Sequence, residues 1–348
     1  MMKNIFLTAD RKTLQVVQDL GRQADAQGLK AWVVGGYVRD LILKRPSQDL
    51  DIVVEGNAIE FARRVASKKS LKVKAHPRFG TAVVLGWADG RHVDCVSARS
   101  EIYPAPGDLP VVKHSGINED LERRDFTINA MAAGLNRREF GILYDPFRGG
   151  EDLRRGVIRI FHDKSFVDDP TRLLRAVRFE QRFGFRFSRR TGNLMRAAID
   201  RRAYCQVSGV RFFREFVRGL MEKSPGRYIR RLKRMGLLEF LAVDRMPASS
   251  VFDRLDDLCS RQEVSPESRR QLYLSALYGE SGDAAIDHAS RVFQWQRRDR
   301  KQLAAFIETI RTVRRLKNRR AIARIYRETF GSCPKDIMVL IQAVGALV

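Results

Sequence analysis

The sequence predicts an α+β protein in which a mixed β-sheet domain comes first and an all-helical part follows. From residue 31 to about residue 150, short β-rich runs alternate with helical patterns and glycines, whereas strand patterns nearly vanish after about residue 165. The chain has 348 residues, which is about twice the usual size of one domain. We therefore expect a sheet-containing domain over 1–150 and helical regions over 151–215 and 216–348.

Runs rich in β-branched residues predict the strands of the first domain. They cover residues 31–34, 51–54, 81–85 and 92–96. Apolar residues spaced three and four apart predict amphipathic helices over 11–29 and 57–68. Proline, glycine and aspartate concentrate between residues 103 and 110, so we expect a long and mobile loop there.

Beyond residue 165, apolar residues recur with periods of three to four, which predicts helices. The stretches with this pattern are 173–183, 210–221, 228–238, 268–278 and 300–316. Gly149-Gly150 and Pro225-Gly226 are the clearest breaks in the chain. We place the boundary between the two parts at the first of these breaks, near residue 150.

The charge of the chain indicates a polyanionic partner. The sequence contains 65 Lys and Arg against 41 Asp and Glu, a net charge of +24. This excess is uneven, because residues 1–150 have a net charge of +5 and residues 151–348 one of +19. Contacts with phosphates supply most of the sequence-independent affinity for nucleic acid, so we expect the helical part to provide that affinity.

Other features exclude a membrane-spanning protein and favour a cytoplasmic one. No stretch approaches the ~18 uninterrupted apolar residues of a membrane-spanning helix. The first ten residues lack the unbroken apolar core of a signal peptide. The cysteines are too far apart to form a zinc motif or a dense disulfide framework, so we expect reduced thiols. These cysteines are Cys95, Cys205, Cys259 and Cys333.

A predicted strand runs into Gly35-Gly36 and then into a helix, which predicts a site for a triphosphate. Glycines let backbone N–H groups approach a phosphate closely. Arg39 follows one turn into the helix and would add positive charge. A pair of glycines alone more often marks a turn, so this prediction depends on the acidic motif that follows it.

That motif is Asp49-Leu50-Asp51, at the start of the next predicted strand. Alternation along a strand places Asp49 and Asp51 on the same face, where two carboxylates suit Mg²⁺. Such ions bridge a triphosphate and activate an attacking hydroxyl. Asp94 lies in a third, apolar strand, where an unpaired charge is costly. We expect a metal or an arginine beside Asp94; an exposed position on an edge strand is the alternative.

Four blocks carry a resemblance to a known family. They are residues 35–40 with 49–51, 120–132, 145–153 and 168–179, and a weaker match covers 207–211. Together they resemble the class II nucleotidyltransferase family, which holds the bacterial tRNA CCA-adding enzymes and the related poly(A) polymerases. The resemblance implies a polymerase-β-like catalytic head, a helical neck that recognises the nucleobase, and a helical body and tail that bind tRNA.

The resemblance also implies roles for individual residues. The implied catalytic residues are Asp49 and Asp51, which bind metal, and Asp94 is a third catalytic candidate because of its place in an apolar strand. The implied nucleotide-binding residues are Gly35, Gly36, Arg39, Arg124, Asp125, Asn129, Asp169, Arg172, Arg175 and Arg178. Asp169 and Arg172 would read the base, since a carboxylate accepts from an exocyclic amino group and a guanidinium donates to a ring nitrogen or carbonyl. Asp168 stands where the family usually has glutamate, and we assign it only to helix capping.

The implied reaction is template-independent addition of CCA, or of only the terminal A, to the tRNA 3′ end. CTP and ATP are the substrates, pyrophosphate leaves, and Mg²⁺ is the cofactor. Residues 99–110 resemble the element that the family needs to switch to ATP. A poly(A) polymerase, a CC-adding enzyme and a non-catalytic RNA-binding relative remain the alternatives. Candidates for contact with the tRNA backbone are Arg211, Arg214, Arg218, Arg227, Arg230, Arg231 and the cluster 311–320.

Overall fold

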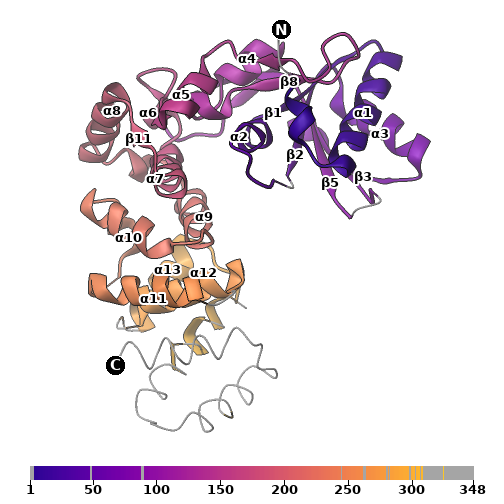
Figure 1. Ribbon diagram of the computed structural model, residues 1–348. Coiled ribbons are helices and arrows are strands. Elements are labelled where there is room, and N and C mark those ends of the chain that lie inside the picture. The colour runs from indigo at the N-terminus through magenta and orange to yellow at the C-terminus, as the bar shows by residue number, and fades with distance from the viewer. Residues whose placement is uncertain are drawn as a thin grey trace. The chain divides into compact units, whose positions relative to one another are not determined.

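The protein is described by a computed structural model. It covers residues 4–308 except 48, 88–89, 244, 262–263, 280, 282, 298, 302 and 306, and it also covers Arg324. The chain divides into two compact units (Figure 1). The first, called the head here, contains the residues up to Ser165 together with Arg186–Thr191, and the second, called the helical unit, contains Phe166–Phe185 and the residues from Gly192 onward.

The head is built on a seven-stranded mixed sheet with the strand order β3-β4-β5-β2-β1-β8-β9. The strands are β1 Lys30–Val34, β2 Leu50–Glu55, β3 Lys72–His76, β4 Thr81–Leu85, β5 His92–Ser97, β8 Ala132–Gly134 and β9 Leu143–Tyr144. β2 and β5 are parallel, and the other neighbouring pairs are antiparallel. All four predicted strands are present, and the predicted α+β class is confirmed.

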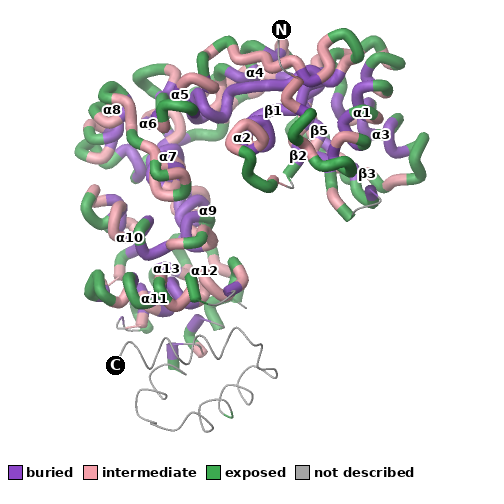
Figure 2. Tube along the Cα trace, in the orientation of Figure 1, coloured by how far each residue is buried: buried purple, intermediate pink, exposed green. Residues whose placement is uncertain are grey.

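Two helices, α1 (Arg11–Ala26) and α3 (Ala58–Lys69), pack on one face of this sheet (Figure 1). Their N-termini are capped by Asp10 and Asn57, whose side chains accept hydrogen bonds from backbone N–H groups of the first turn. Buried residues of the head include most of β1 and one side of α1 (Figure 2). Along β4 and β5, buried residues alternate with half-buried or exposed ones. This alternation is typical of an antiparallel sheet with one covered face.

On the opposite face, an apolar cluster covers the half of the sheet around β1 and β8. Its members are Trp32, Val34, Val53, Ala98, Ile117, Leu121, Ala130 and Ala132. Helix α4 (Ile117–Glu122) contributes two of these residues. The cluster therefore holds residues 120–132, the second of the four sequence blocks, against β1 and next to the turn that follows this strand.

Smaller elements complete the head. They are α2 (Gly36–Ile42), β6 (Arg99–Ile102), β7 (Val111–His114), α5 (Gly149–Arg155), β10 (Val157–Ile158), β11 (Arg186–Phe187) and the 3₁₀ turns η1 (Ile5–Thr8), η2 (Pro77–Phe79) and η3 (Thr127–Asn129). Strands β6 and β7 form a hairpin, and the expected loop over 103–110 is the connection between them. The head extends beyond residue 150 because α5 packs against η3 and β10 pairs with β11.

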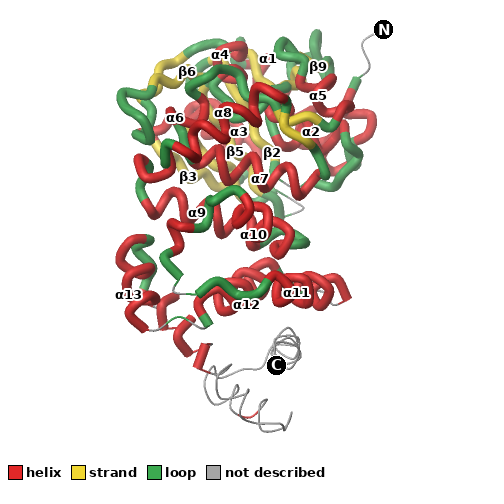
Figure 3. The backbone as a smooth tube through the Cα atoms, turned by 90° about the vertical axis from the view of Figure 1, so that its left-hand side faces the viewer, coloured by secondary structure: helices red, strands yellow, loops and turns green. Residues whose placement is uncertain are grey.

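The helical unit consists of helices and short 3₁₀ turns among the residues that are described (Figure 3). The helices from its beginning onward are α6 Ser165–Asp168, α7 Thr171–Phe183, α8 Arg189–Asp200, α9 Gly209–Leu220, α10 Pro225–Arg234, α11 Ser249–Arg261, α12 Pro266–Tyr278 and α13 Asp283–Val292. The first residues of α6 and α8 belong to the head. Four predicted helices match α7, α9, α10 and α12, and the predicted helix 300–316 extends beyond the described residues. Among the described helices, none is long and apolar enough to cross a bilayer.

Aromatic side chains of α9 organise the core of the helical unit. The ring of Phe213 stacks on that of Phe293 at 4.3 Å between centroids. Phe212 and Phe216 both meet Phe240 edge to face. Such arrangements add about 0.5–1.5 kcal/mol each beyond the burial of apolar area. They fix one side of α9, and its polar side packs against α7 of the same unit.

Candidate active site

Three carboxylates lie on the sheet face opposite α1 and α3. Asp51 on β2 and Asp94 on β5 are register partners in parallel neighbouring strands, so their backbones are about 4.8 Å apart. Asp49 precedes β2 and is exposed, whereas Asp51 and Asp94 are half-buried. The register places Asp94 beside Asp51, and it excludes the edge-strand alternative for Asp94, since β5 lies between β4 and β2.

Burial, with help from neighbouring negative charges, raises the pKa of Asp51 and of Asp94. Burial raises the pKa of the Asp51 carboxyl to about 6. Arg124 opposes this rise, whereas the negative charges of Asp94 and Asp49 add to it. Burial also raises the pKa of Asp94; His92 opposes that rise and Asp49 adds to it. A cluster of this kind gains when a cation binds, because the cation stabilises the ionised carboxylates.

These residues fit a hard divalent cation. Within the described part of the chain, no group of three or more His, Cys, Asp or Glu side chains converges on one point as a complete metal cluster. The protein therefore offers a pair of carboxylates, Asp49 and Asp51, and leaves the remaining ligands to other oxygens. Mg²⁺ is commonly held in this way, by one or two carboxylates together with phosphates and water.

The turn after β1 places the backbone of Gly35 beside the guanidinium group of Arg124. Gly35 has a φ of 69°, which favours glycine, and a Cβ at this position would lie only 2.5 Å from Nη1 of Arg124. Arg124 Nη2 donates to Oδ2 of Asp120 at 2.9 Å, while its buried Nε has no hydrogen-bond partner. An unsatisfied guanidinium N–H beside a glycine turn can receive an anionic ligand.

An arginine of α2 that binds phosphate would keep its guanidinium N–H groups for the ligand, whereas those of Arg39 are bound to protein groups. It is 4% exposed and donates through Nε and Nη2 to both carboxylate oxygens of Asp40, each at 2.9 Å. Its Nη1 donates to the side-chain oxygen of Asn129, and Asn129 in turn donates to Asp125 at 2.8 Å. The structure thus brings Arg39, Asn129 and Asp125 into one buried network, in which Arg39 holds Asn129 in place.

A second network connects the β6–β7 hairpin to Arg124. Oε1 of Glu101 accepts from Arg99 and from Arg123, at 3.1 and 2.9 Å. Arg123 also donates to Asp120 at 2.7 Å, and Asp120 pairs with Arg124. Burial would raise the pKa of Asp120, but the two arginines outweigh it and hold the pKa below its usual value. Sequence reasoning did not select Asp120, although an acidic residue three and four positions before two arginines on a helix was a usable signal.

In the helical unit, Asp169 organises the start of α7. Its Oδ1 accepts from the backbone N–H and the hydroxyl of Thr171, at 3.2 and 2.7 Å. The same oxygen pairs with Arg211 of α9 at 3.3 Å. Helix α7 begins at Thr171 with Pro170 as its N-cap, whereas Asp168 is the last residue of α6, so the prediction that Asp168 caps the helix is wrong. The neighbouring Arg172 is 4% exposed.

Arg175 and Arg178, the next two predicted nucleotide ligands, both pair with Glu215 of α9. The distances are 3.6 Å for Arg175 and 3.2 Å for Arg178, and Glu215 is 5% exposed. Arg218 donates to the same carboxylate at 2.8 Å. Burial lowers the pKa of Arg178 and Glu215 opposes that effect. Sequence reasoning did not select Glu215, since its partners on α7 are about forty positions away.

The predicted tRNA-contacting arginines divide into two groups. Arg211, Arg218, Arg230 and Arg231 form ion pairs within the helical unit. Arg214 and Arg227 are exposed. The cluster 311–320 lies outside the described residues.

Comparisons with known proteins agree with this geometry. A family model described as the Poly A polymerase head domain matches residues 31–159. An A-adding tRNA nucleotidyltransferase of Geobacter sulfurreducens is 44% identical over 248 residues, 71% of this chain. An A-adding tRNA nucleotidyltransferase of Halalkalibacterium halodurans is 42% identical over 257 residues, 74% of this chain. The chain spans 28% and 55% of the lengths of these two relatives.

A solved structure extends the similarity to the helical unit. The Thermotoga maritima CCA-adding enzyme complexed with tRNA-CCA matches with a TM-score of 0.71 at 31% sequence identity. The match covers 98% of this chain and 80% of that chain. The likeness therefore includes both units and is accompanied by sequence identity well above that of unrelated proteins with a common fold.

Proposed function

The chain belongs to the class II nucleotidyltransferase family of tRNA CCA-adding and A-adding enzymes. From this membership we propose that it transfers nucleotides to the 3′ end of tRNA without a nucleic-acid template. The observation that supports the chemistry most strongly is the group of Asp49, Asp51 and Asp94 on one sheet face, next to the glycine turn and Arg124. A non-catalytic relative would not need half-buried carboxylates side by side on neighbouring strands.

In the proposed reaction, the 3′ oxygen of the RNA forms a bond to the α-phosphorus of the nucleotide, and the bond from that phosphorus to the bridging oxygen breaks. Pyrophosphate then leaves. A divalent ion, which we propose is Mg²⁺ held by Asp49 and Asp51, would supply charge neutralisation and lower the pKa of the attacking hydroxyl. Asp94 would receive the hydroxyl proton on its carboxylate. Gly35, Gly36 and Arg124 would bind the triphosphate, and Arg39, Asp125 and Asn129 would hold the ribose side of the site.

Base selection is proposed for α7. The Oδ1 atom of Asp169 is engaged with Thr171 and Arg211, and this leaves Oδ2 to accept from the exocyclic amino group of adenine or cytosine. Arg172 would donate to a ring nitrogen or carbonyl of the same base. Arg175 and Arg178 would add positive charge beside the nucleotide, with Glu215 fixing their positions.

Addition of the terminal A is the reaction that the comparisons favour. The two A-adding relatives described above are 44% and 42% identical to this chain, whereas the matched CCA-adding enzyme is 31% identical. Full CCA addition is the second candidate, because that CCA-adding structure matches 98% of this chain. The two candidates differ in which tRNA ends they extend, so the substrate profile distinguishes them.

The test uses three tRNA transcripts, which end before CCA, after C and after CC. Each is incubated with the purified protein and Mg²⁺ together with CTP, ATP or both, and the products are resolved at single-nucleotide length. An A-adding enzyme extends only the CC end, by one A. A full CCA-adding enzyme completes all three ends. An Asp49→Asn variant is the control for contaminating activity.

Other outcomes would contradict the proposal. Addition that stops after CC would identify a CC-adding enzyme. Long A tails on any RNA would identify a poly(A) polymerase. A folded protein that binds tRNA and incorporates no nucleotide would be the non-catalytic relative, and circular dichroism of the same sample would establish that it is folded.

A further inference from the structure

The half of the sheet that contains β3, β4 and β5 has an open face beside the carboxylates. In β4 and β5, the residues that point away from α1 and α3 are half-buried or exposed. β3 continues this pattern to the edge of the sheet, where Lys72, Lys74 and His76 are exposed. Leu85 on β4 is 38% exposed and His92 on β5 is also exposed. We call this surface the open face.

The strand register divides the open face into rows that run across the strands. The first row is Asp51, Asp94, Val83 and Lys74. The second row is His92, Leu85 and Lys72. Leu50 is the register partner of Val93, so the preceding residues Asp49 and His92 lie at the same level, and the second row runs from the Asp49 side of the site. The first row begins at two carboxylates and the second at His92, and each row ends at a lysine of the edge strand. With neighbouring strands about 4.8 Å apart, the backbone of Lys74 is roughly 14 Å from that of Asp51.

The order of the strands indicates the side of the sheet from which the RNA would approach the carboxylates. The glycine turn that would bind the triphosphate follows β1, and β1 lies next to β2. In an in-line displacement, the attacking hydroxyl and the departing pyrophosphate are on opposite sides of the α-phosphorus. β5, β4 and β3 lie on the other side of β2 from β1. The RNA strand that carries the hydroxyl therefore approaches from the open face.

We propose that the open face is the surface along which the last nucleotides of the RNA acceptor strand reach the carboxylates, with Lys72 and Lys74 bound to its phosphates. This inference rests on the proposed function and identifies a subsite for the RNA substrate. Roughly 14 Å corresponds to about four stacked nucleotides at ~3.4 Å each, and to fewer if the strand is extended. The lysines therefore contact phosphates within about four nucleotides of the reacting end.

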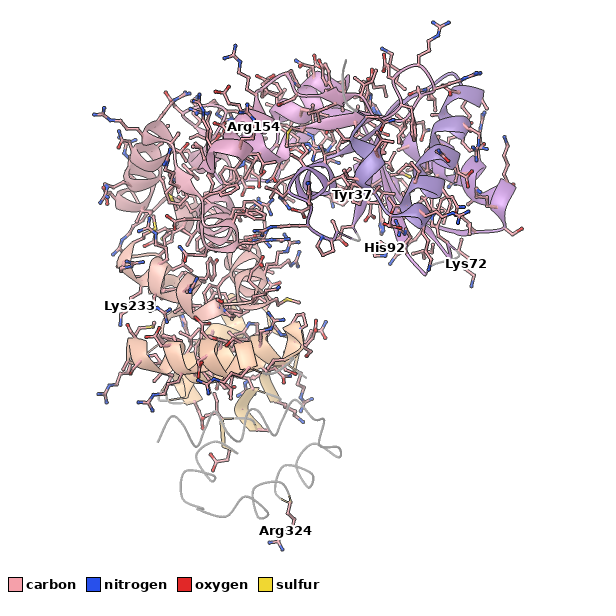
Figure 4. All side chains as sticks on the ribbon, viewed as in Figure 1. Tyr37, Lys72, His92, Arg154, Lys233 and Arg324 are labelled. Atoms are coloured by element: carbon pink, nitrogen blue, oxygen red, sulfur yellow. The ribbon has the colours of Figure 1, made fainter. Side chains whose placement is uncertain are left out.

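The chemistry of the surface matches a sugar-phosphate strand. Lysine is a flexible point charge and binds phosphate without a fixed geometry. Between the lysines and the carboxylates, Val83 and Leu85 provide an apolar floor for sugars and bases. In Figure 4 the labelled side chains of Lys72 and His92 project from the same end of the head. None of these groups can read a base by paired hydrogen bonds, so the subsite accepts any sequence.

The experiment compares the double variant Lys72→Ala/Lys74→Ala with the wild type by steady-state kinetics. Removal of two phosphate contacts should raise KM for tRNA by roughly 5- to 30-fold at ~0.1 M salt and leave KM for ATP and kcat nearly unchanged. The dependence of log(kcat/KM) on log[salt] should become shallower by about 1.4 to 1.8. The matched control is Lys12→Ala/Lys68→Ala, which removes the same charge from exposed positions of α1 and α3.

A modified RNA locates the contact. Replacing single phosphates by uncharged methylphosphonates near the 3′ end should weaken the wild type but not the Lys72→Ala/Lys74→Ala variant at the contacted positions. If both double variants have the same KM for tRNA, the lysines only keep the edge strand from pairing with other chains, and the inference is wrong. Absence of incorporation by the wild type would instead refute the proposed function, so the two failures are distinguishable.

Discussion

At the scale of single residues, the carboxylates of the candidate active site destabilise the metal-free fold. The pKa of Asp51 is raised to about 6, above the ordinary value of about 3.9 in an unfolded chain. Between these two values the folded state holds more protons than the unfolded state, so stability decreases as pH rises from about 4 to 6. The same burial that makes Asp51 suitable for a cation therefore has a cost above pH 6.

We predict that Asp51→Asn stabilises the metal-free protein at pH 7.5, by about 1–3 kcal/mol, and abolishes activity. At pH 4 the two proteins should differ by less than about 0.5 kcal/mol, because Asp51 is then protonated in the folded state and about half protonated in the unfolded state. Urea titrations at both pH values in the presence of a chelator measure the difference. Equal or lower stability of the variant at pH 7.5 would show that Arg124 compensates the Asp51 charge without a metal.

At the scale of secondary-structure elements, the sequence predicted the strands of the active site better than the edge of the sheet. β1, β2, β4 and β5 contain runs of β-branched residues, and all four were predicted. β3 alternates charged and small residues, Lys72-Val73-Lys74-Ala75-His76, since an edge strand covers one face only and carries lysines on the other. Strands β6 and β7, which flank the predicted loop over 103–110, were not predicted, because the turn residues between them dominate the local pattern.

The partners of the predicted site residues were harder to foresee than the residues themselves. Asp169 and Arg178 could be selected because they fall in a recognisable block of sequence. Their partners Arg211 and Glu215 lie on α9, and only the packing of α7 against α9 brings the four together. A single sequence has no local signal for such a contact, since neither spacing nor periodicity relates the two helices.

The shared carboxylate on α9 leads to a prediction about stability. Glu215→Ala would leave Arg175, Arg178 and Arg218 without their common partner, and loss of one member of a buried ion pair costs about 3–5 kcal/mol. The control is Glu239→Ala, since the pair of Glu239 with Arg202 is exposed on both sides and should contribute ~0–1 kcal/mol. Urea unfolding of both variants tests this. Equal losses would mean that the arginines find other partners.

At the scale of the whole molecule, the distribution of charge separates RNA binding from chemistry. Residues 151–348 have a net charge of +19 and residues 1–150 one of +5. Most of the affinity for tRNA should thus come from the second part of the chain and should decrease steeply with salt. Asp49 and Asp51 contribute negative charge to the head and cannot attract the RNA, so under the proposed function they would act only at the reacting end.

We therefore predict that the double variant Asp49→Asn/Asp51→Asn loses nucleotide incorporation but binds tRNA at least as tightly as the wild type. Removing two negative charges weakens the repulsion of phosphates, so a slight gain in affinity in chelator is expected, with an unchanged salt slope. Fluorescence anisotropy with labelled tRNA at several salt concentrations measures both quantities. The Lys72→Ala/Lys74→Ala protein is the comparison, since it should show the opposite change, a shallower salt slope. A loss of tRNA affinity in the aspartate variant would show that the carboxylates organise the RNA-binding surface as well as the chemistry.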